Sequence, residues 1–98
     1  MIKVIEGYNG KPSANMQSLF MEFRANVMQY PGFMSAENLV SQRDGSIVLF
    51  VSTWDTVENW RLWEKSSVRT KLYQEAEELI EDEPRVSIFR LVPTHWES

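Results

Sequence analysis

The sequence predicts an α+β protein of the ferredoxin-like class, with the element order β-α-β-β-α-β and a four-stranded antiparallel sheet. Two observations lead to this fold. Short apolar segments typical of strands alternate with two segments whose apolar residues recur at helical spacing. Asp44-Gly45, a pair typical of tight hairpins, separates the two central strands. A chain of 98 residues suits one compact domain, so we expect a single domain over residues 1–98.

The first half of the chain predicts a strand, a helix and a second strand. Residues 2–8 are rich in apolar side chains and end at Asn9-Gly10, which is typical of a strand followed by a turn. From residue 13 onward the apolar residues form one helical stripe: Met16, Leu19, Phe20, Phe23, Val27 and Tyr30. Pro31-Gly32 ends this helix, and residues 33–42 predict the next strand.

The pattern of the third predicted strand indicates that a second copy of the chain covers one face of the sheet. Residues 47–51 are apolar at every position, whereas an antiparallel strand with one solvated face alternates. We infer that both faces of this strand are covered. The two predicted helices cover one face of the sheet only, so the sequence predicts a homodimer formed through the other face.

The second helical region has a defined start and an internal break. Asp55 with Glu58 three residues later resembles a capping box, with Asp55 as the N-cap. The helical pattern continues to about residue 80, and Ser66-Ser67 breaks or kinks it.

An acidic run and a last strand follow. Residues 75–83 are rich in carboxylates but lack a calcium-loop pattern, so we interpret them as a solvated helix end. Pro84 ends the helix, and residues 86–92 alternate as the fourth strand.

Composition excludes several classes of protein. Ten Lys and Arg against fourteen Asp and Glu exclude a uniformly basic nucleic-acid surface. Cysteine is absent and His95 is the single histidine, so we expect no metal site. No apolar segment approaches the roughly 20 residues that span a bilayer, and the charged N-terminal segment is unlike a signal peptide. We therefore expect a cytoplasmic protein without a membrane partner.

Four side chains of the second helical region are candidates for a site. Asn59, Trp60 and Trp63 lie on one arc of the helix that must face the sheet, and Tyr73 follows the break. Two interpretations remain open for them. The rings pack in the core with Asn59 at its edge, or they line a pocket in which Tyr73 hydrogen-bonds a ligand.

Almost the whole chain resembles the antibiotic biosynthesis monooxygenase family. The resemblance rests on Pro31-Gly32-Phe33 before the second strand, on the Asp-Gly turn, and most specifically on residues 52–63, which contain Trp54, Trp60 and Trp63. It implies a dimeric α+β barrel with a pocket in each subunit. Members of the family include oxygenases that oxidise anthrones or quinols without metal or flavin, and haem-degrading enzymes.

The resemblance also implies roles for individual residues. Asn59 and Trp63 match a pocket-lining Asn and Trp four residues apart. The family's pocket Tyr would fall at Arg69, and Tyr73 lies four residues beyond it. In the haem-degrading branch, Tyr73 stands where the axial His is expected.

The resemblance implies a monooxygenase that needs no cofactor and oxidises a small quinol, phenol or anthrone-like substrate with O₂. The catalytic residues that we expect from it are Asn59, Trp63 and Tyr73. The residues assigned to substrate contact are Trp60, Arg69, Phe23 and Tyr8. The alternatives are a non-enzymatic dimer that binds a small ligand, and a haem-binding or haem-degrading protein with Tyr73 or His95 as the iron ligand.

Overall fold

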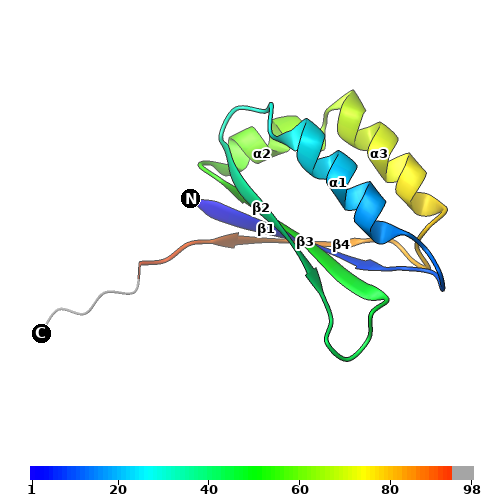
Figure 1. Ribbon diagram of the computed structural model, residues 1–98. Helices are drawn as coiled ribbons and strands as arrows, with labels where there is room; N and C mark the ends of the chain where they lie inside the picture. Colours follow the sequence, from blue (N-terminus) through cyan, green and yellow to red (C-terminus); the bar gives the residue numbers. More distant parts are fainter. Residues whose placement is uncertain (94–98) are drawn as a thin grey trace, which may run out of the picture.

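The computed structural model describes residues 1–93, and His95 lies outside these residues. The chain forms four strands and three helices, in agreement with the predicted ferredoxin-like class (Figure 1). The elements in chain order are β1 (Ile2–Asn9), α1 (Met16–Val27), β2 (Phe33–Val40), β3 (Ile47–Trp54), α2 (Val57–Glu64), α3 (Ser67–Glu77) and β4 (Arg85–Arg90).

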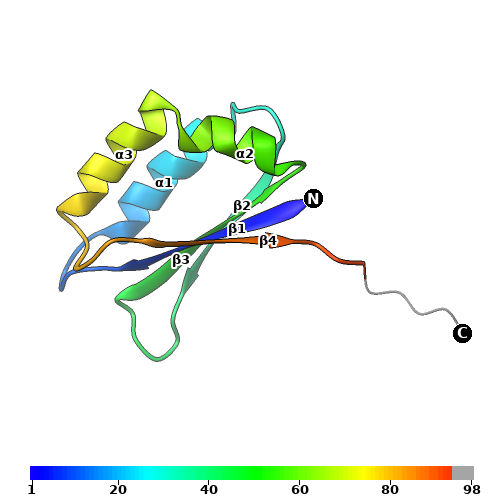
Figure 2. The same cartoon turned by 180° about the vertical axis from the view of Figure 1, so that it is seen from behind.

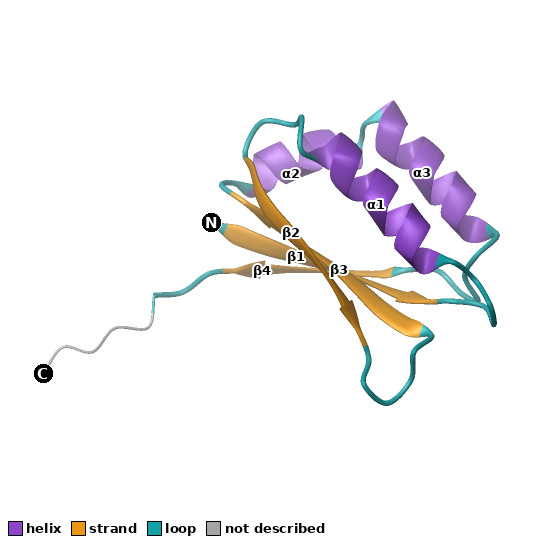
Figure 3. Cartoon of the chain, viewed as in Figure 1, coloured by secondary structure: helices purple, strands orange, loops and turns teal. Residues whose placement is uncertain are grey.

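The strands form one antiparallel sheet in the order β2-β3-β1-β4. All three helices lie on the same side of this sheet, as the two opposite views show (Figures 1 and 2). The cartoon coloured by secondary structure shows the two resulting layers (Figure 3). No helix among residues 1–93 is both long and apolar enough to cross a membrane.

The predicted break in the second helical region divides it into two helices. The hydroxyl of Ser66 accepts a hydrogen bond of 3.1 Å from the backbone N–H of Arg69, which makes Ser66 the N-cap of α3. The predicted N-cap of α2 was wrong by one residue. Thr56 has the extended backbone of an N-cap, and its hydroxyl accepts from the N–H of Asn59 at 3.2 Å. The Asp55 carboxylate instead accepts from the N–H of Thr56 at 2.6 Å.

Aromatic rings fill the layer between the helices and the sheet. Phe20 and Phe23 of α1 pack against Phe50 of β3, with ring centroids 5.7 and 5.6 Å apart. Tyr8 of β1 meets Phe20 edge-on at 5.2 Å. The core therefore absorbs much of the large aromatic content of the chain.

The sheet face that points away from the helices, which we call the open face, carries apolar side chains along its centre, with Lys3, Glu37 and Arg85 among its polar residues. Val51 is paired with Ile5 across β3 and β1, and Leu49 with Leu39 across β3 and β2. Phe89 of β4 lies on the same face and is 54% exposed. An apolar face of this kind is typical of a surface that another protein copy covers.

Candidate functional site

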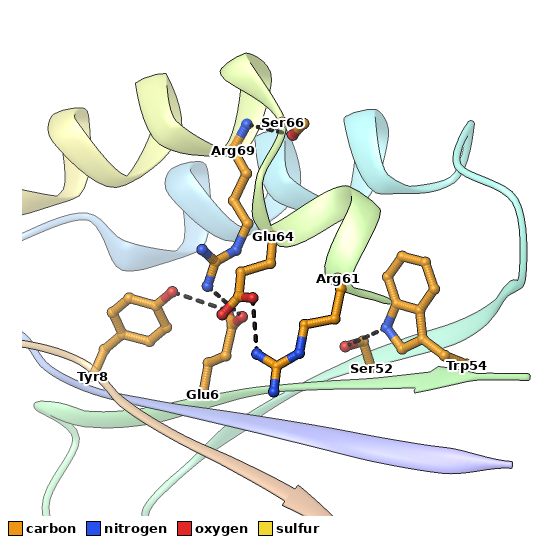
Figure 4. Close-up of polar contacts among 8 residues, drawn as sticks. All are labelled: Glu6, Tyr8, Ser52, Trp54, Arg61, Glu64, Ser66 and Arg69. Atoms are coloured by element: carbon orange, nitrogen blue, oxygen red, sulfur yellow. Dashed lines mark hydrogen bonds and ion pairs between the residues drawn. The ribbon is translucent and has the colours of Figure 1, made fainter. Parts of the chain in front are cut away.

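A buried carboxylate lies at the centre of the strongest polar cluster. Along β1, alternate side chains point toward the helices, and Glu6 is the charged residue in that series (Figure 4). Glu6 is only 2% exposed. Its Oε1 accepts a hydrogen bond of 3.0 Å from Nη2 of Arg69, and its Oε2 accepts one of 3.1 Å from the hydroxyl of Tyr8. The ion pair thus joins strand β1 to helix α3, and the phenol of Tyr8, on the same strand as Glu6, donates to the other carboxylate oxygen.

Tyr73 completes this group, which we call the Glu6 cluster: Glu6, Tyr8, Arg69 and Tyr73. The Arg69 guanidinium lies over the Tyr73 ring, 4.0 Å from its centroid, a distance typical of a cation–π contact. The Tyr73 ring meets those of Tyr8 and Phe23 edge-on, at 6.3 and 6.0 Å.

Two polar atoms of the Glu6 cluster are buried without a hydrogen-bond partner: the hydroxyl of Tyr73 and Nε of Arg69. The Tyr73 and Tyr8 hydroxyls are close enough to affect each other's pKa, but no hydrogen bond of ordinary geometry joins them. Unpaired buried donors are uncommon in folded proteins and mark places where a ligand atom or water can bind.

A cavity of about 500 Å³ opens beside the Glu6 cluster, and Tyr73 is part of its wall. The other residues around it belong to the end of α3 and the turn that follows: Glu77, Ile80, Glu81, Asp82, Glu83 and Pro84. Four of these carry carboxylates, so the entrance of the cavity has a negative potential.

Burial governs the protonation of the Glu6 cluster. Loss of hydration raises the pKa of Glu6, and the Arg69 guanidinium and the Tyr8 hydroxyl oppose this rise. Burial, together with the nearby Glu6, raises the pKa of Tyr73 to about 12. Burial and the nearby Glu6 also raise the pKa of Tyr8 above its ordinary range. Both phenols are therefore protonated near neutral pH and can donate hydrogen bonds.

The residues predicted on α2 occupy a different place. The side-chain amide of Asn59 donates to Oδ1 of Asp55 at 2.9 Å, and this bond lowers the pKa of Asp55. A Cβ on Gly32 would lie 2.6 Å from the Asn59 amide nitrogen, so the amide packs directly against the turn between α1 and β2. We call this group, Gly32 with Asp55 and Asn59, the Gly32 turn.

The two tryptophans of α2 are core residues. Trp63 is 1% exposed and meets Tyr30 edge-on with ring centroids 4.9 Å apart. Trp60 is also 1% exposed, and its indole N–H is buried without a partner. The wall of the cavity beside Tyr73 includes neither tryptophan nor Asn59.

The structure thus brings together four of the predicted residues, Tyr8, Phe23, Arg69 and Tyr73, and places Asn59, Trp60 and Trp63 elsewhere along the helical layer. Sequence analysis did not select Glu6. The available signal was its position in the alternating series Ile2, Val4, Glu6 and Tyr8, where a charged side chain at an inward position indicates a partnered or functional group.

Several solved structures have closely similar folds. SnoaB, a cofactor-independent oxygenase from Streptomyces nogalater, is 13% identical, with a TM-score of 0.84 over 98% of this chain and 97% of that chain. A protein from Deinococcus radiodurans, named as a candidate antibiotic biosynthesis monooxygenase, is 11% identical, with a TM-score of 0.86 over 100% of this chain and 99% of that chain. A further antibiotic biosynthesis monooxygenase is 21% identical, with a TM-score of 0.78 over 95% of this chain and 100% of that chain. The chain has the fold of the antibiotic biosynthesis monooxygenases.

At these identities the comparison establishes the architecture, as the resemblance of residues 52–63 predicted. No family model matches the sequence, and no curated protein matches it either. Within this antibiotic biosynthesis monooxygenase fold, residues 1–93 contain no group of three or more His, Cys, Asp or Glu side chains arranged to hold a metal ion.

Proposed function

We propose that the protein is a cofactor-independent monooxygenase that oxidises a small aromatic substrate of the phenol, quinol or anthrone type with O₂. Tyr73 binds the substrate oxygen in the cavity beside the Glu6 cluster. The observation that carries the proposal is Tyr73: the residue forms part of the wall of a cavity of about 500 Å³, and its hydroxyl is buried, protonated near neutral pH and without a hydrogen-bond partner. A cavity of this size suits a small aromatic molecule.

The chemistry places modest demands on the protein. A substrate that ionises to a stabilised anion can pass an electron to O₂ itself. For an anthrone-like CH₂ group, one oxygen atom enters the substrate as a carbonyl, and the two hydrogens leave with the other oxygen as water. The protein contributes a hydrogen bond to the developing oxyanion and a site with little water. Tyr73 provides the former, and its neighbours Tyr8 and Phe23 contribute rings to the latter.

Asn59 and Trp63 enter the proposal through the resemblance. The resemblance assigns Asn59 a hydrogen bond to the substrate oxygen and Trp63 a place in the pocket wall, although neither residue lines the cavity beside Tyr73. In the free protein the Asn59 amide is bound to Asp55, so this role requires the amide to leave that contact.

The proposal includes a homodimer formed through the open face. The apolar side chains of this face include Phe89 and Leu39, which are 54% and 47% exposed in the single chain. Covering such a face in an obligate dimer buries more than about 2,000 Å². We expect a dimer in sedimentation at micromolar concentration.

One pair of variants tests the interface. Phe89→Glu should give a folded monomer, whereas Leu62→Glu, at an equally exposed apolar residue of α2 (58% exposed), should remain a dimer. A wild-type monomer at micromolar concentration contradicts the dimer.

Oxygen consumption tests the proposed activity. An oxygen electrode is used with a panel of anthrones, hydroquinones and catechols, first without and then with a metal chelator, and with a protein-free control for autoxidation. We expect protein-dependent uptake with at least one of these classes. Absence of uptake with the whole panel, or loss of uptake on adding the chelator, contradicts the proposal.

One observation favours a second function, a non-enzymatic dimer that binds a small ligand. The space between helices and sheet is filled by the rings of Tyr8, Phe20, Phe23 and Phe50, so the cavity lies beside the core rather than inside it. Ligand binding without oxygen uptake would identify this function.

The residues of the site do not fit haem. The phenolate of Tyr73 would have to bind the iron, and burial, which raises the pKa of Tyr73 to about 12, disfavours that phenolate.

A further inference from the structure

Glu6 is the one buried carboxylate among residues 1–93. It lies on the inner face of β1, below α3, and both of its oxygens accept a hydrogen bond (Figure 4). Arg69 approaches from the side of α3, and Tyr8 approaches along β1. Each carboxylate oxygen retains a further lone pair, so Glu6 can still accept a proton.

Stability alone does not account for this arrangement. Removing a carboxylate and a guanidinium from water costs several kcal/mol each, and a buried ion pair is often no more stable than apolar side chains of similar volume. The positions of Glu6 and Arg69, which are 2% and 6% exposed, could therefore hold apolar residues without loss of stability. A chemical role explains why charges occupy these positions.

The cluster connects Glu6 to the cavity. Tyr8 donates to Glu6, and the ring of Tyr8 contacts that of Tyr73, whose hydroxyl is buried and unpaired. Tyr73 is in turn part of the cavity wall. Only the link from Tyr8 to Glu6 is hydrogen-bonded in the free protein, so the path from Tyr73 to Glu6 requires the Tyr73 and Tyr8 hydroxyls, which are neighbours, to come into hydrogen-bond contact when the substrate binds.

The charge at the entrance of the cavity restricts which form of a phenol can enter. Its carboxylates, among them Glu77 and Glu81, repel anions, so a phenol enters in its neutral form. The proton that such a substrate loses before it reacts must then be taken up inside the protein.

We propose that Glu6 is the proton acceptor of this site and receives the proton of a phenolic or similarly acidic substrate through Tyr73 and Tyr8. This inference rests on the proposed function and deepens it, since it names the base and the neutral, weakly acidic class of substrate.

The transfer balances without any other reactant. The substrate O–H or C–H bond breaks, and its proton binds Oη of Tyr73. Tyr73 passes its own proton to Oη of Tyr8, which passes its proton to Oε2 of Glu6. The products are a substrate anion and a neutral Glu6 carboxyl group, and no electrons are transferred in this step.

The charges around Glu6 suit this role. Burial raises the pKa of Glu6, which makes it a stronger base than an exposed glutamate. The charged and titratable groups that face it are Tyr8 on its own strand, Arg69 and Tyr73 of α3, and Glu64 of α2. Arg69 opposes the rise in the pKa of Glu6, and Glu64, which is paired with Arg61 at 2.9 Å, adds to it.

A chromogenic phenol tests the proposal directly. The probe is 4-nitrophenol, whose phenolate absorbs visible light, at a pH where the free phenol is mostly neutral. Binding is followed separately through the tryptophan fluorescence. We expect wild-type protein to bind the probe as the phenolate. In Glu6→Gln the bound phenolate signal should fall at least about tenfold, the effect of one pKa unit, while the probe still binds.

Two further variants complete the experiment. Tyr8→Phe keeps the ion pair of Glu6 with Arg69 and removes the path for the proton, so it should lose the phenolate signal as Glu6→Gln does. It also keeps the test decisive if Glu6→Gln does not fold. Glu75→Gln, at an exposed carboxylate of α3, should retain the full signal.

The outcomes separate the inference from the proposed function. A probe that binds wild type as the neutral phenol, or as the phenolate in both Glu6→Gln and Tyr8→Phe, overturns the role of Glu6 and leaves the proposed function intact. A wild-type protein that binds no phenol overturns both.

Discussion

The Glu6 cluster and the Gly32 turn differ in how their polar atoms are satisfied. In the Glu6 cluster, buried polar atoms of Tyr73 and Arg69 remain without partners beside a cavity. In the Gly32 turn, the Asn59 amide is bound to Asp55 and closely packed against Gly32. The contrast indicates that the first region has unused capacity for a ligand, while the second uses its polar groups to hold a turn.

The largest effect is expected when the ion pair of the Glu6 cluster is broken. Arg69→Met should lower the free energy of unfolding by about 3–5 kcal/mol, because it leaves a buried carboxylate without its partner. Denaturant unfolding at a fixed protein concentration measures the loss. Adding Glu6→Gln to Arg69→Met should recover part of it, and a loss below about 1 kcal/mol in the single variant would contradict a buried, coupled pair.

The next effect concerns the backbone of the Gly32 turn. Gly32 has φ +83°, and a Cβ there would collide with the side chains of Asp55 and Asn59. Gly32→Ala should therefore lower the free energy of unfolding by about 2–3 kcal/mol.

Gly45 provides the matched control, because a Cβ at Gly45 would meet nothing within 4 Å. Gly45→Ala should change stability by less than about 0.5 kcal/mol. Equal effects at the two glycines would show that the turn is not packed as described.

The pH dependence of stability reports on Glu6. Burial raises its pKa above the ordinary value of 4.5, so the folded protein binds this proton more tightly than the unfolded chain. The stability that Glu6 contributes is complete below 4.5 and is lost as the pH rises through the raised pKa. The free energy of unfolding of wild type should therefore fall relative to that of Glu6→Gln as the pH rises above 4.5. A change of the opposite sign would mean that Arg69 outweighs burial.

The smallest effect is expected at Asn59. Because its amide is already bound to Asp55, Asn59→Ala should lower turnover by no more than about tenfold, less than the loss of a dedicated oxyanion donor. Thermal unfolding serves as the control: we expect turnover to fall while the unfolding temperature of Asn59→Ala stays near that of wild type. Unchanged turnover would assign Asn59 to the Gly32 turn alone.

The order of elements could be predicted from sequence because each boundary has a local cause. Asp44-Gly45 lies between β2 and β3, and Ser66 caps α3, so these two signals and the structure coincide. The helix expected up to Pro31-Gly32 was too long, because α1 ends at Val27 and Tyr30 lies in the turn that follows. The sequence predicted Asp55 as the N-cap of α2, but the N-cap is Thr56. Both residue types can cap a helix, and the neighbouring sequence does not determine which of the two adopts the N-cap backbone conformation.

The candidate site was less accessible to prediction. Helical spacing correctly placed Trp60 and Trp63 on an inward face, but spacing cannot tell a core ring from a pocket ring. Glu6 and Arg69 are 63 residues apart in the chain, and the pairing of β1 with the helical layer brings them together. Such a contact depends on tertiary structure. The sequence indicates it only through the position of Glu6, a charged residue among the inward-facing apolar residues of β1.

Oxygen consumption by Tyr73→Phe tests the central claim most directly. This variant keeps the ring and its contact with Arg69, and removes only the hydroxyl that is proposed to bind the substrate oxygen. With a substrate that wild type oxidises, we expect kcat/KM to fall on the order of 10²-fold while thermal stability stays near that of wild type. Oxygen uptake by Tyr73→Phe at the wild-type rate would contradict the account.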